Sequence, residues 1–326
     1  MNSGNAPTMK DVAREAGVAL GTVSKVINGK PVGEAYRKKV EAAAKKLGYQ
    51  VNSYARGLKT NKTYCVALVM PSLKNPFFAE LTNALSRSLA AHGYRSVLMI
   101  TNFDSDIEKK CFSLAAQHKI DGIIALTYCP DPGMVESVPV VTIDRHFSSE
   151  TPCISSDNYE GGKMAASKLI SLGCKNLLFF STKTEVYSEV EKRGLGFQEV
   201  CRTEGVAFQT LDLKSGDSEV PFYRFLEQHI RDGVLEFDGI FCNSDRIAVR
   251  VQKFLESKGI RIPEDVQMIG YDGIVDFYTC QPVCSTIVQP IARMAETAVQ
   301  VLLNQTESPS NITLPVYYLP GGTTRD

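Results

Sequence analysis

The sequence predicts an all-helical N-terminal head, a short hinge and a large α/β core of two lobes. Residues 8–47 contain three short helical patterns, each with an apolar stripe and a glycine near its end. Residues 50–63 are polar and basic and contain no apolar core of their own. From residue 64 onward, apolar runs typical of buried strands alternate with segments of helical length. This alternation predicts parallel sheets covered by helices.

The bulk composition is that of a globular protein. The chain has 326 residues, of which 44% are hydrophobic, and no apolar run approaches the roughly 18 residues of a membrane span. The first ten residues lack the basic and apolar regions of a secretion signal. Nine cysteines stand far apart between Cys65 and Cys284, and this pattern predicts reduced thiols in a cytoplasmic protein. We expect no metal site, because no ligand spacing is typical of one, and no cofactor.

The net charge of zero hides a strong partition along the chain. Residues 1–62 contain twelve Lys or Arg and four Asp or Glu, a net charge of +8, and the remaining 264 residues carry −8. A basic segment on an acidic body indicates a head that binds a polyanion. Nucleic acid is the favoured partner, and a solvated basic surface is the alternative.

Three short helices are predicted in the head. Thr8 and Asp11 form the pattern of a capping box at the first helix, which Gly17 ends. The second helix ends at Asn28-Gly29, and the third spans residues 34–47. The apolar stripes consist of Met9, Val12, Ala13 and Ala16 in the first helix, Val23, Val26 and Ile27 in the second, and Val40, Ala43, Ala44 and Leu47 in the third.

A helix, a glycine turn and a second helix form the helix-turn-helix pattern, whose second helix enters the major groove of DNA. Leu20, Gly21 and Lys25 are predicted at the base edges, where lysine donates to guanine and leucine contacts a thymine methyl. Three polar side chains of this helix are predicted to bind phosphates, namely Thr22, Ser24 and Asn28. The alternative is an ordinary three-helix domain whose hydroxyls only cap helices.

The body contains seven apolar runs that predict strands and five amphipathic segments that predict helices. The runs are CVALVM, SVLMI, GIIAL, VPVVTID, NLLFF, DGIFCN and VQMIGYD, and the helical segments span 77–92, 106–118, 159–172, 191–204 and 244–258. So many units predict two lobes, between which the chain crosses near residues 153–162 and again near 285–290. Ligands of such sheets bind at the carboxyl ends of the strands, so the cleft between the lobes is the predicted binding site.

The ordered set of motifs resembles the lactose-repressor (LacI/GalR) family of bacterial transcriptional regulators over essentially the whole chain. The motifs are MKDVAREAGV, TVSKVING, AAAKKLGY and NSYARGLKTNKT in the head and hinge, and NPFF, VVTIDR, SSDNYEGG, RGLGF, FCNSDRIAV, IPEDVQMIGYDGI and STIVQP in the body. The resemblance implies a DNA-binding domain at 1–49, a hinge at 50–63 and a periplasmic-binding-protein-like core at 64–326. The implied lobes comprise 64–158 plus 288–317, and 159–287 plus 318–326.

The resemblance also implies roles for the hinge. In the family, this segment folds into a helix in the minor groove of operator DNA, and a leucine wedges into the central base step. Leu58 occupies that place, with Ala55 beside it, and Asn52 and Lys59 are assigned to the same DNA surface. Unstacking a base step is offset by the wider contact with a bent duplex. The alternative for Leu58 is a buried linker residue.

In the family, the positions of five core residues line the effector site: Phe77, Arg193, Phe241, Asp245 and Asp272. Carboxylates that accept hydroxyl hydrogen bonds, a planar guanidinium and an aromatic face suit a polyhydroxylated ligand. Packing in the core is the alternative for Phe241, and an ion pair with Glu189 is the alternative for Arg193. Asp144 and Arg145 also follow a strand, but they are not assigned to the site, since they are equally consistent with an internal ion pair.

The chain departs from the family pattern at four positions. Ala19 and Gly33 replace serine caps, Tyr36 replaces a threonine, and Val51 replaces a proline. Replacing a capping serine by alanine costs about 0.5–2 kcal/mol. We therefore expect a head that depends on DNA for part of its order.

The sequence predicts a sequence-specific transcriptional regulator, most simply a homodimeric repressor on a pseudo-palindromic operator, controlled by a small effector such as a sugar. The dimer is expected because the chain ends without leucine heptads. The alternative is a free-standing sugar-binding protein of a transport system, which would need an export signal and would not use a basic head. No nucleophile elbow, phosphate loop or metalloprotease motif is present, so we expect no enzyme. The sequence does not determine whether the effector is an inducer or a corepressor.

Overall fold

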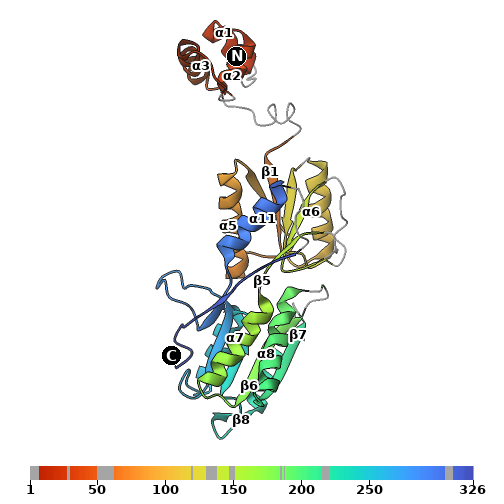
Figure 1. Cartoon of the computed structure of the whole chain (residues 1–326), viewed down its shortest axis with the longest axis vertical. Coiled ribbons are helices and arrows are strands. Elements are labelled where there is room, and N and C mark those ends of the chain that lie inside the picture. Colours follow the sequence, from red (N-terminus) through yellow and green to blue (C-terminus); the bar gives the residue numbers. More distant parts are fainter. Residues whose placement is uncertain are drawn as a thin grey trace. The chain divides into compact units, whose positions relative to one another are not determined.

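The computed structural model describes residues 7–27, 30–49, 62–118, 120–129, 138–146, 151–183, 186, 188–214, 220–304 and 311–325. The chain divides into two compact units, residues 1–63 and residues 64–326. Each unit is considered by itself below. Figure 1 shows the helices of the first unit and the two sheets of the second.

The first unit contains the three predicted helices, α1 (Met9–Ala16), α2 (Leu20–Ile27) and α3 (Glu34–Leu47). The predicted capping box is confirmed, because Thr8 N donates to Asp11 Oδ2 at 2.9 Å and Thr8 Oγ1 accepts from Asp11 N at 3.4 Å. Gly17 ends α1 in the left-handed conformation, with φ 64°. Glycine adopts this conformation at little cost, which explains why it ends the helix.

The core of the head is small. Its fully buried side chains come from all three helices, and they are Val12, Ala13, Val23, Val40 and Ala43. Alanine and valine at the crossings let the short helices pack closely, as the predicted stripes required. A salt bridge of 2.6 Å between Lys46 Nζ and Glu15 Oε1 joins α3 to α1 at the surface. Because so little apolar area is buried, the head has few contacts with which to resist unfolding.

The second unit contains two six-stranded sheets, one in each lobe. The first sheet is entirely parallel and has the order β13 (Asn311–Leu314), β5 (Cys153–Ser156), β4 (Val140–Ile143), β3 (Gly122–Ala125), β1 (Cys65–Met70) and β2 (Arg95–Ile100). The second has the order β14 (Tyr317–Leu319), β12 (Thr286–Val288), β11 (Gln267–Asp272), β10 (Gly239–Cys242), β6 (Asn176–Lys183) and β7 (Ala207–Lys214), with β14 antiparallel to β12. A two-stranded hairpin, β8 (Ile230–Arg231) and β9 (Val234–Leu235), comes between β7 and β10 in the sequence.

Helices cover both faces of the first sheet. Alternate residues of a strand point to opposite faces: Leu68 packs with α5 (Pro76–Ala91) and α11 (Ile291–Asn304), whereas Val69 packs with α6 (Ser105–Gln117). Both faces of β1 are apolar for this reason, which explains its continuous CVALVM run. Figure 1 shows α5 and α11 side by side on one face.

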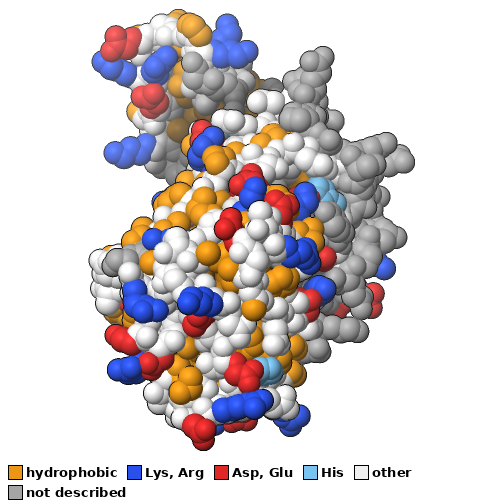
Figure 2. Space-filling model, turned by 60° about the horizontal axis from the view of Figure 1, so that its bottom comes forward, with side chains coloured by type: hydrophobic (Ala, Val, Ile, Leu, Met, Phe, Trp, Pro, Cys, Tyr) orange, Lys and Arg blue, Asp and Glu red, His pale blue; other side chains and the backbone are white. Residues whose placement is uncertain are grey.

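The second sheet is covered in the same way. Leu177 of β6 packs toward α7 (Asn158–Ser171) and α8 (Lys192–Thr203), and Leu178 packs toward α9 (Val220–Gln228) and α10 (Asp245–Ser257). A short 3₁₀ helix, η1 (Glu189–Glu191), precedes α8. On the face shown in Figure 2, positive and negative side chains are interspersed over this lobe, in keeping with the overall charge balance.

The chain passes three times between the lobes. It crosses from β5 to α7, returns from β12 to α11, and crosses again from β13 to β14. The predicted fold class is confirmed by the helical head and by the two sheets, one parallel and one parallel except for its edge strand β14. Several elements were not identified individually from the sequence, namely β5, β7, β8, β9, β12, β13, β14, η1, α9 and α11. Three of these strands, β7, β13 and β14, lie at sheet edges, where a continuous apolar run is not required, and the other four are only two to four residues long.

Candidate functional site

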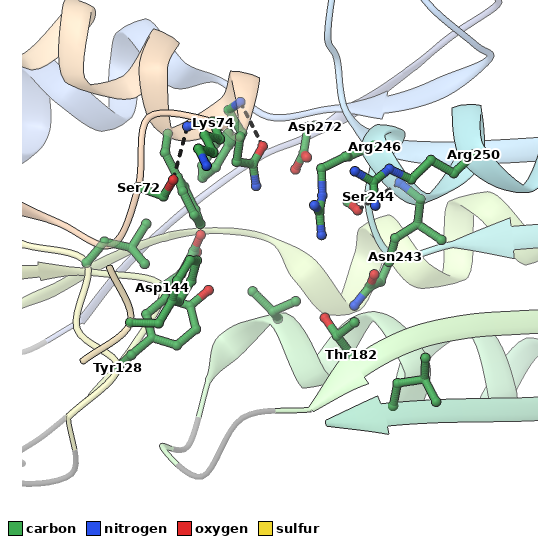
Figure 3. A pocket seen from close by; sticks show the side chains of 18 of the residues that line it. Ser72, Lys74, Tyr128, Asp144, Thr182, Asn243, Ser244, Arg246, Arg250 and Asp272 are labelled. Atoms are coloured by element: carbon green, nitrogen blue, oxygen red, sulfur yellow. Dashed lines mark hydrogen bonds between the residues drawn. The ribbon is translucent and has the colours of Figure 1, made fainter. Parts of the chain in front are cut away.

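A cavity of about 770 Å³ lies between the two lobes of the second unit. Its walls come from the carboxyl ends of strands and the first turns of helices in both sheets, as the topology predicts. Figure 3 shows Ser72, Tyr128 and Asp144 on one side of the cavity and Thr182, Asn243 and Arg246 on the other. The remaining lining residues are Lys74, Asn75, Phe77, Phe78, Asn102, Phe103, Leu126, Arg145, Val190, Arg193, Leu213, Val220, Phe222, Tyr223, Ser244, Ile247, Arg250, Asp272 and Gln289.

Arg193 is buried and held from several directions. Its Nε donates to Asn158 Oδ1 at 2.6 Å and its Nη1 donates to the Asn243 carbonyl at 2.5 Å. The guanidinium lies 3.5 Å from the centre of the Tyr271 ring, and Nη1 is 3.9 Å from Asp272 Oδ1. A charge fixed by this many partners has one orientation, so the cavity wall is preorganised there.

The alternative reading of Arg193 as the partner of Glu189 is wrong. Glu189 instead pairs with His146 Nε2 at 3.0 Å and with Lys192 Nζ at 2.6 Å. Because His146 follows β4 in the first lobe, this pair joins the lobes at one edge of the cavity. Glu189 N also donates to the Asp144 carbonyl across the same junction, at 2.8 Å.

Two glycines allow α8 to carry Arg193 to this place. A Cβ on Gly162 of α7 would lie 2.0 Å from the Arg193 carbonyl oxygen, and a Cβ on Gly196 of α8 would lie 2.1 Å from the Tyr159 carbonyl oxygen. Only glycine fits at such separations, so α7 and α8 approach backbone to backbone. The glycines of the EGG and RGLGF motifs therefore set the depth at which Arg193 enters the cavity wall.

Asp272 ends β11 with φ 129° and lies on the cavity wall. Its Oδ1 accepts from Gln289 Nε2 at 2.8 Å, and Gln289 Oε1 accepts from Ser156 Oγ of the first lobe at 2.8 Å. Burial raises the pKa of Asp272 well above its usual range, and the nearby Arg193 opposes that rise. This chain of hydrogen bonds links a ligand-facing carboxyl to both lobes.

Asp144 and Arg145 both line the cavity, and no ion pair joins them among the described residues. Asp144 Oδ1 is buried and has no hydrogen-bond partner within the described part of the chain. Burial raises the pKa of Asp144, while Arg193 and Arg145 lower it. The Arg145 guanidinium lies 3.9 Å from the centre of the Tyr128 ring. An unsatisfied buried acceptor is costly, so Asp144 Oδ1 is available to a hydrogen-bond donor that enters the cavity.

Phe77 lines the cavity at the first turn of α5. The helix begins there because Asn75 Oδ1 accepts from Phe77 N at 3.1 Å and Pro76 occupies the first turn. The ring packs edge-on against Phe78, with 5.9 Å between centroids. The first lobe therefore offers an apolar face beside the polar groups of the second.

Phe241 and Asp245, both predicted in the effector site, are not among the described residues that line this cavity. The Phe241 ring is stacked inside the second lobe, 5.1 Å from Phe179 and 5.7 Å from Phe197, so the core alternative describes it. Strand alternation explains this, since Phe241 is in phase with Gly239 and points to the α7 and α8 face.

Asp245 is fully buried behind the cavity wall. Its carboxylate accepts from Thr286 Oγ1 at 2.6 Å, Ile274 N at 2.7 Å and Gly273 N at 2.9 Å. The first-turn side chain of α10 thus points back toward β11 and β12. Because it anchors the backbone that follows Asp272, Asp245 positions the wall without forming it.

Sequence reasoning missed several wall residues. Arg246 and Arg250 stand one helical turn apart on α10, and Tyr128 follows β3. For the two arginines, the sequence signal was their i, i+4 spacing at the start of a helix that follows a strand. It was not recognised because charged pairs at this spacing are typical of solvated helix faces.

The structure describes five of the ten residues predicted to bind DNA in the head and hinge. Leu20 is 44% exposed at the start of α2, and Gly21 and Lys25 are also exposed. Thr22 and Ser24 are half-buried. Five further predicted residues lie outside the described residues, namely Asn28, Asn52, Ala55, Leu58 and Lys59.

No group of three or more described acidic, cysteine or histidine side chains is arranged to hold a metal ion. Among the described helices, none has the length and apolar character that crossing a membrane requires.

Two family models cover nearly the whole chain. Residues 8–52 match bacterial regulatory proteins of the lacI family, and residues 63–320 match periplasmic binding proteins and the sugar binding domain of the LacI family. The sucrose operon repressor of Streptococcus mutans is 32% identical over 319 residues, which are 96% of this chain and 98% of that protein. The ribose operon repressor of Halalkalibacterium halodurans is 32% identical over 305 residues, 92% of this chain and 90% of that protein. The lac repressor dimer bound to operator and the anti-inducer ONPF has the same fold, with a TM-score of 0.82, 22% identity and coverage of 98% and 99%.

Proposed function

Because this chain belongs to the LacI family of bacterial regulatory proteins, we propose that it acts in the cytoplasm as a homodimer whose two heads bind the halves of a pseudo-palindromic operator. It is a DNA-binding transcriptional repressor with a sugar effector, and not a transport binding protein, because a lacI-type head precedes the sugar-binding core. Control operates through binding alone, without a catalysed reaction.

The head reads DNA through the exposed start of α2. We assign Leu20, Gly21 and Lys25 to base edges, and Thr22, Ser24 and Asn28 to phosphates. The exposure of Leu20 is consistent with this assignment, because a side chain that contacts a base edge must be accessible in the free head. In the hinge, Leu58 is the proposed minor-groove wedge, beside Ala55, Asn52 and Lys59.

The effector occupies the cavity between the lobes. Asp144, Asp272 and Asn243 hold its hydroxyls, Arg193 donates a planar fork, and Phe77 covers an apolar ring face. Phe241 and Asp245 act indirectly, through packing and through the position of Asp272. The single observation that carries the proposal is the cavity itself, which has buried, unpartnered polar atoms of both lobes on its wall.

Control follows from thermodynamic linkage. A ligand that contacts both lobes favours the lobe angle at which its contacts are best, and it shifts the equilibrium only by its differential affinity. The hinge joins the core directly before β1, so a change in lobe angle within a dimer changes the spacing of the two hinges. A coupling of about 1–3 kcal/mol between sugar and operator is typical of such systems.

The test is a fluorescence anisotropy titration of the full chain against a pool of random duplexes at two salt concentrations, followed by sequencing of the bound fraction. Enrichment of a palindrome, with an affinity that falls steeply with salt, is the expected result. Addition of a sugar panel then shows whether the effector releases or strengthens the complex. Failure to enrich any sequence with or without sugars would refute the proposal.

A further inference from the structure

A buried carboxylate lies behind the first-lobe wall of the cavity. Glu108 is in the first turn of α6, is 1% exposed and is not among the described residues that line the cavity. Its Oε2 accepts a hydrogen bond from Tyr128 N at 3.1 Å, and its Oε1 accepts one from Thr127 Oγ1. Thr127 Oγ1 also accepts from Cys129 N at 3.2 Å. Both oxygens of the carboxylate therefore fix the turn that follows β3.

This turn places the Tyr128 ring between two other side chains of the wall. The ring of Phe103 meets it edge-on, with 4.9 Å between centroids and 84° between planes, and the Arg145 guanidinium lies 3.9 Å from its centre. The three residues follow β2, β3 and β4, and all of them line the cavity. Figure 3 shows Tyr128 on the same side of the cavity as Asp144, the residue before Arg145. A guanidinium at this distance is attracted to the ring, so we expect the two side chains to move together.

Arg145 has a hydrogen-bond donor that the wall does not use. The residue is 6% exposed, and its Nε has no hydrogen-bond partner among the described residues. Arginine keeps its charge when it is buried, so it needs carboxylates nearby. Burial raises the pKa of Asp144 and of Glu108, and the charge of Arg145 is among the causes that lower it in both. Arg145 thus interacts with one carboxylate on the cavity wall and one behind it, and its Nε is available to an oxygen atom in the cavity.

We propose that Glu108 is a positioning residue of the effector site, which holds Tyr128 and through it the Arg145 guanidinium, so that Nε can donate to an oxygen of the effector. This inference rests on the proposed function and assigns part of it to a side chain outside the cavity. Glutamine has nearly the volume of glutamate, but it has one acceptor oxygen and no charge. In Glu108→Gln the turn loses one of its two hydrogen bonds to the side chain, and Arg145 loses a counter-charge. The alternative is a purely structural role, in which Glu108 stabilises the lobe without an effect on Arg145.

The first test observes Arg145 directly, in the full chain and without a sugar. In the NMR spectrum of an isotopically labelled chain, the Nε–Hε signal of Arg145 is assigned by its absence from the spectrum of Arg145→Lys. Stacking on Tyr128 should shift this signal upfield, and Glu108→Gln should move it back toward the position of an exposed arginine. Tyr128→Leu, which keeps the backbone donor to Glu108, should move it in the same direction. Asp106→Asn removes a negative charge from the exposed side of the same helix turn and should leave the signal unchanged.

The second test measures binding. D-ribose and sucrose serve as neutral probes, a monosaccharide and a disaccharide, in calorimetric titrations of the wild type, Glu108→Gln, Arg145→Gln and the double variant. We expect Glu108→Gln to raise the Kd by about tenfold, the typical effect of a lost hydrogen bond to a charged group. Because Glu108 acts through Arg145, the double variant should bind no more weakly than Arg145→Gln alone. A role that does not pass through Arg145 would instead give effects that add.

The inference is overturned if the Arg145 signal does not move in Glu108→Gln, or if the effects of the two single substitutions on the Kd add. Urea denaturation shows whether each variant is folded. If Glu108→Gln is not, Thr127→Val takes its place, because it removes one hydrogen bond to the carboxylate and leaves Tyr128 N bound, and a smaller shift in the same direction is then required. The NMR comparison needs neither sugar nor DNA, so it decides the position of Arg145 independently of the repressor function, which absence of operator enrichment would refute separately.

Discussion

Two aspartates that follow neighbouring strands of the second lobe have opposite surroundings. Asp245, just after β10, is enclosed by Thr286 and by the amides of Gly273 and Ile274. Asp272, at the end of β11, lies on the cavity wall beside Arg193. A position after a strand thus predicts the region in which a carboxyl lies, but not the direction in which it points. One of these carboxyls is bound within the lobe and the other faces the cavity.

Phe241 and Phe103 show the same division between the interior of a lobe and the cavity wall. Their substitution tests the largest expected effect on stability. Phe241 is fully buried in a stack with Phe179 and Phe197, so Phe241→Ala should lower the free energy of unfolding of the core by about 3–5 kcal/mol. Phe103→Ala is the control, because Phe103 lines the cavity and is 48% exposed. Urea denaturation measures both. Equal stability of the two variants would contradict the assignment of Phe241 to the core.

The Asp245→Asn variant tests the interior aspartate. The substitution places an amide against backbone donors, so we expect the free energy of unfolding to fall by about 2–3 kcal/mol. In Asp272→Asn the amide keeps an oxygen for Gln289 and faces a hydrated cavity, so the loss should be smaller than that. Thermal unfolding of the two variants side by side makes the comparison. If Asp245→Asn were as stable as the wild type but did not respond to sugar, Asp245 would belong to the ligand site after all.

On the cavity wall, Arg193→Gln should weaken binding of the effector that the operator titration identifies. The variant loses the fork between Asn158 and the Asn243 carbonyl and leaves Asp272 without its cation. We expect about a 30-fold rise in Kd, which corresponds to about 2 kcal/mol. Arg202→Gln, at the exposed end of the same helix, is the matched control for calorimetry. An unchanged Kd in Arg193→Gln would remove Arg193 from the ligand site.

Periodicity was sufficient to predict most of the elements that pack on both faces, although the short interior strands β5 and β12 were not identified. The CVALVM run became β1 because both of its faces are apolar, and the three stripes of the head met around Val12, Val23 and Val40. Edge strands such as β7 have one face in contact with solvent, and their sequence AFQTLDLK does not form an apolar run. The fold class could therefore be predicted, but the complete set of strands could not.

The candidate site was predictable in place but not in composition. Gly162 and Gly196 let α7 and α8 approach closely, and this approach determines how far Arg193 reaches into the cavity wall. The separation of the two helices depends on tertiary packing and cannot be read from the sequence. The outward direction of Arg246 and Arg250 likewise depends on how α10 is rotated against β10 and β11. In its first turn the Asp245 side chain is bound by Thr286, whereas Arg246 and Ile247 line the cavity.

The smallest expected effect is a pH dependence that separates the wall from the interior of the lobe. Burial raises the pKa of Asp272 in the folded chain, so above the usual range of a carboxyl the folded state binds more protons than the unfolded state. Stability then falls as pH rises through the folded pKa, by about 1.4 kcal/mol for each unit of difference. Asp272→Asn removes this titration, so the stability that the variant loses relative to the wild type should become smaller as pH rises from 5 to 8. A pH-independent difference in urea denaturation would mean that Arg193 keeps Asp272 ionised throughout, and that the wall carries more negative charge than burial alone allows.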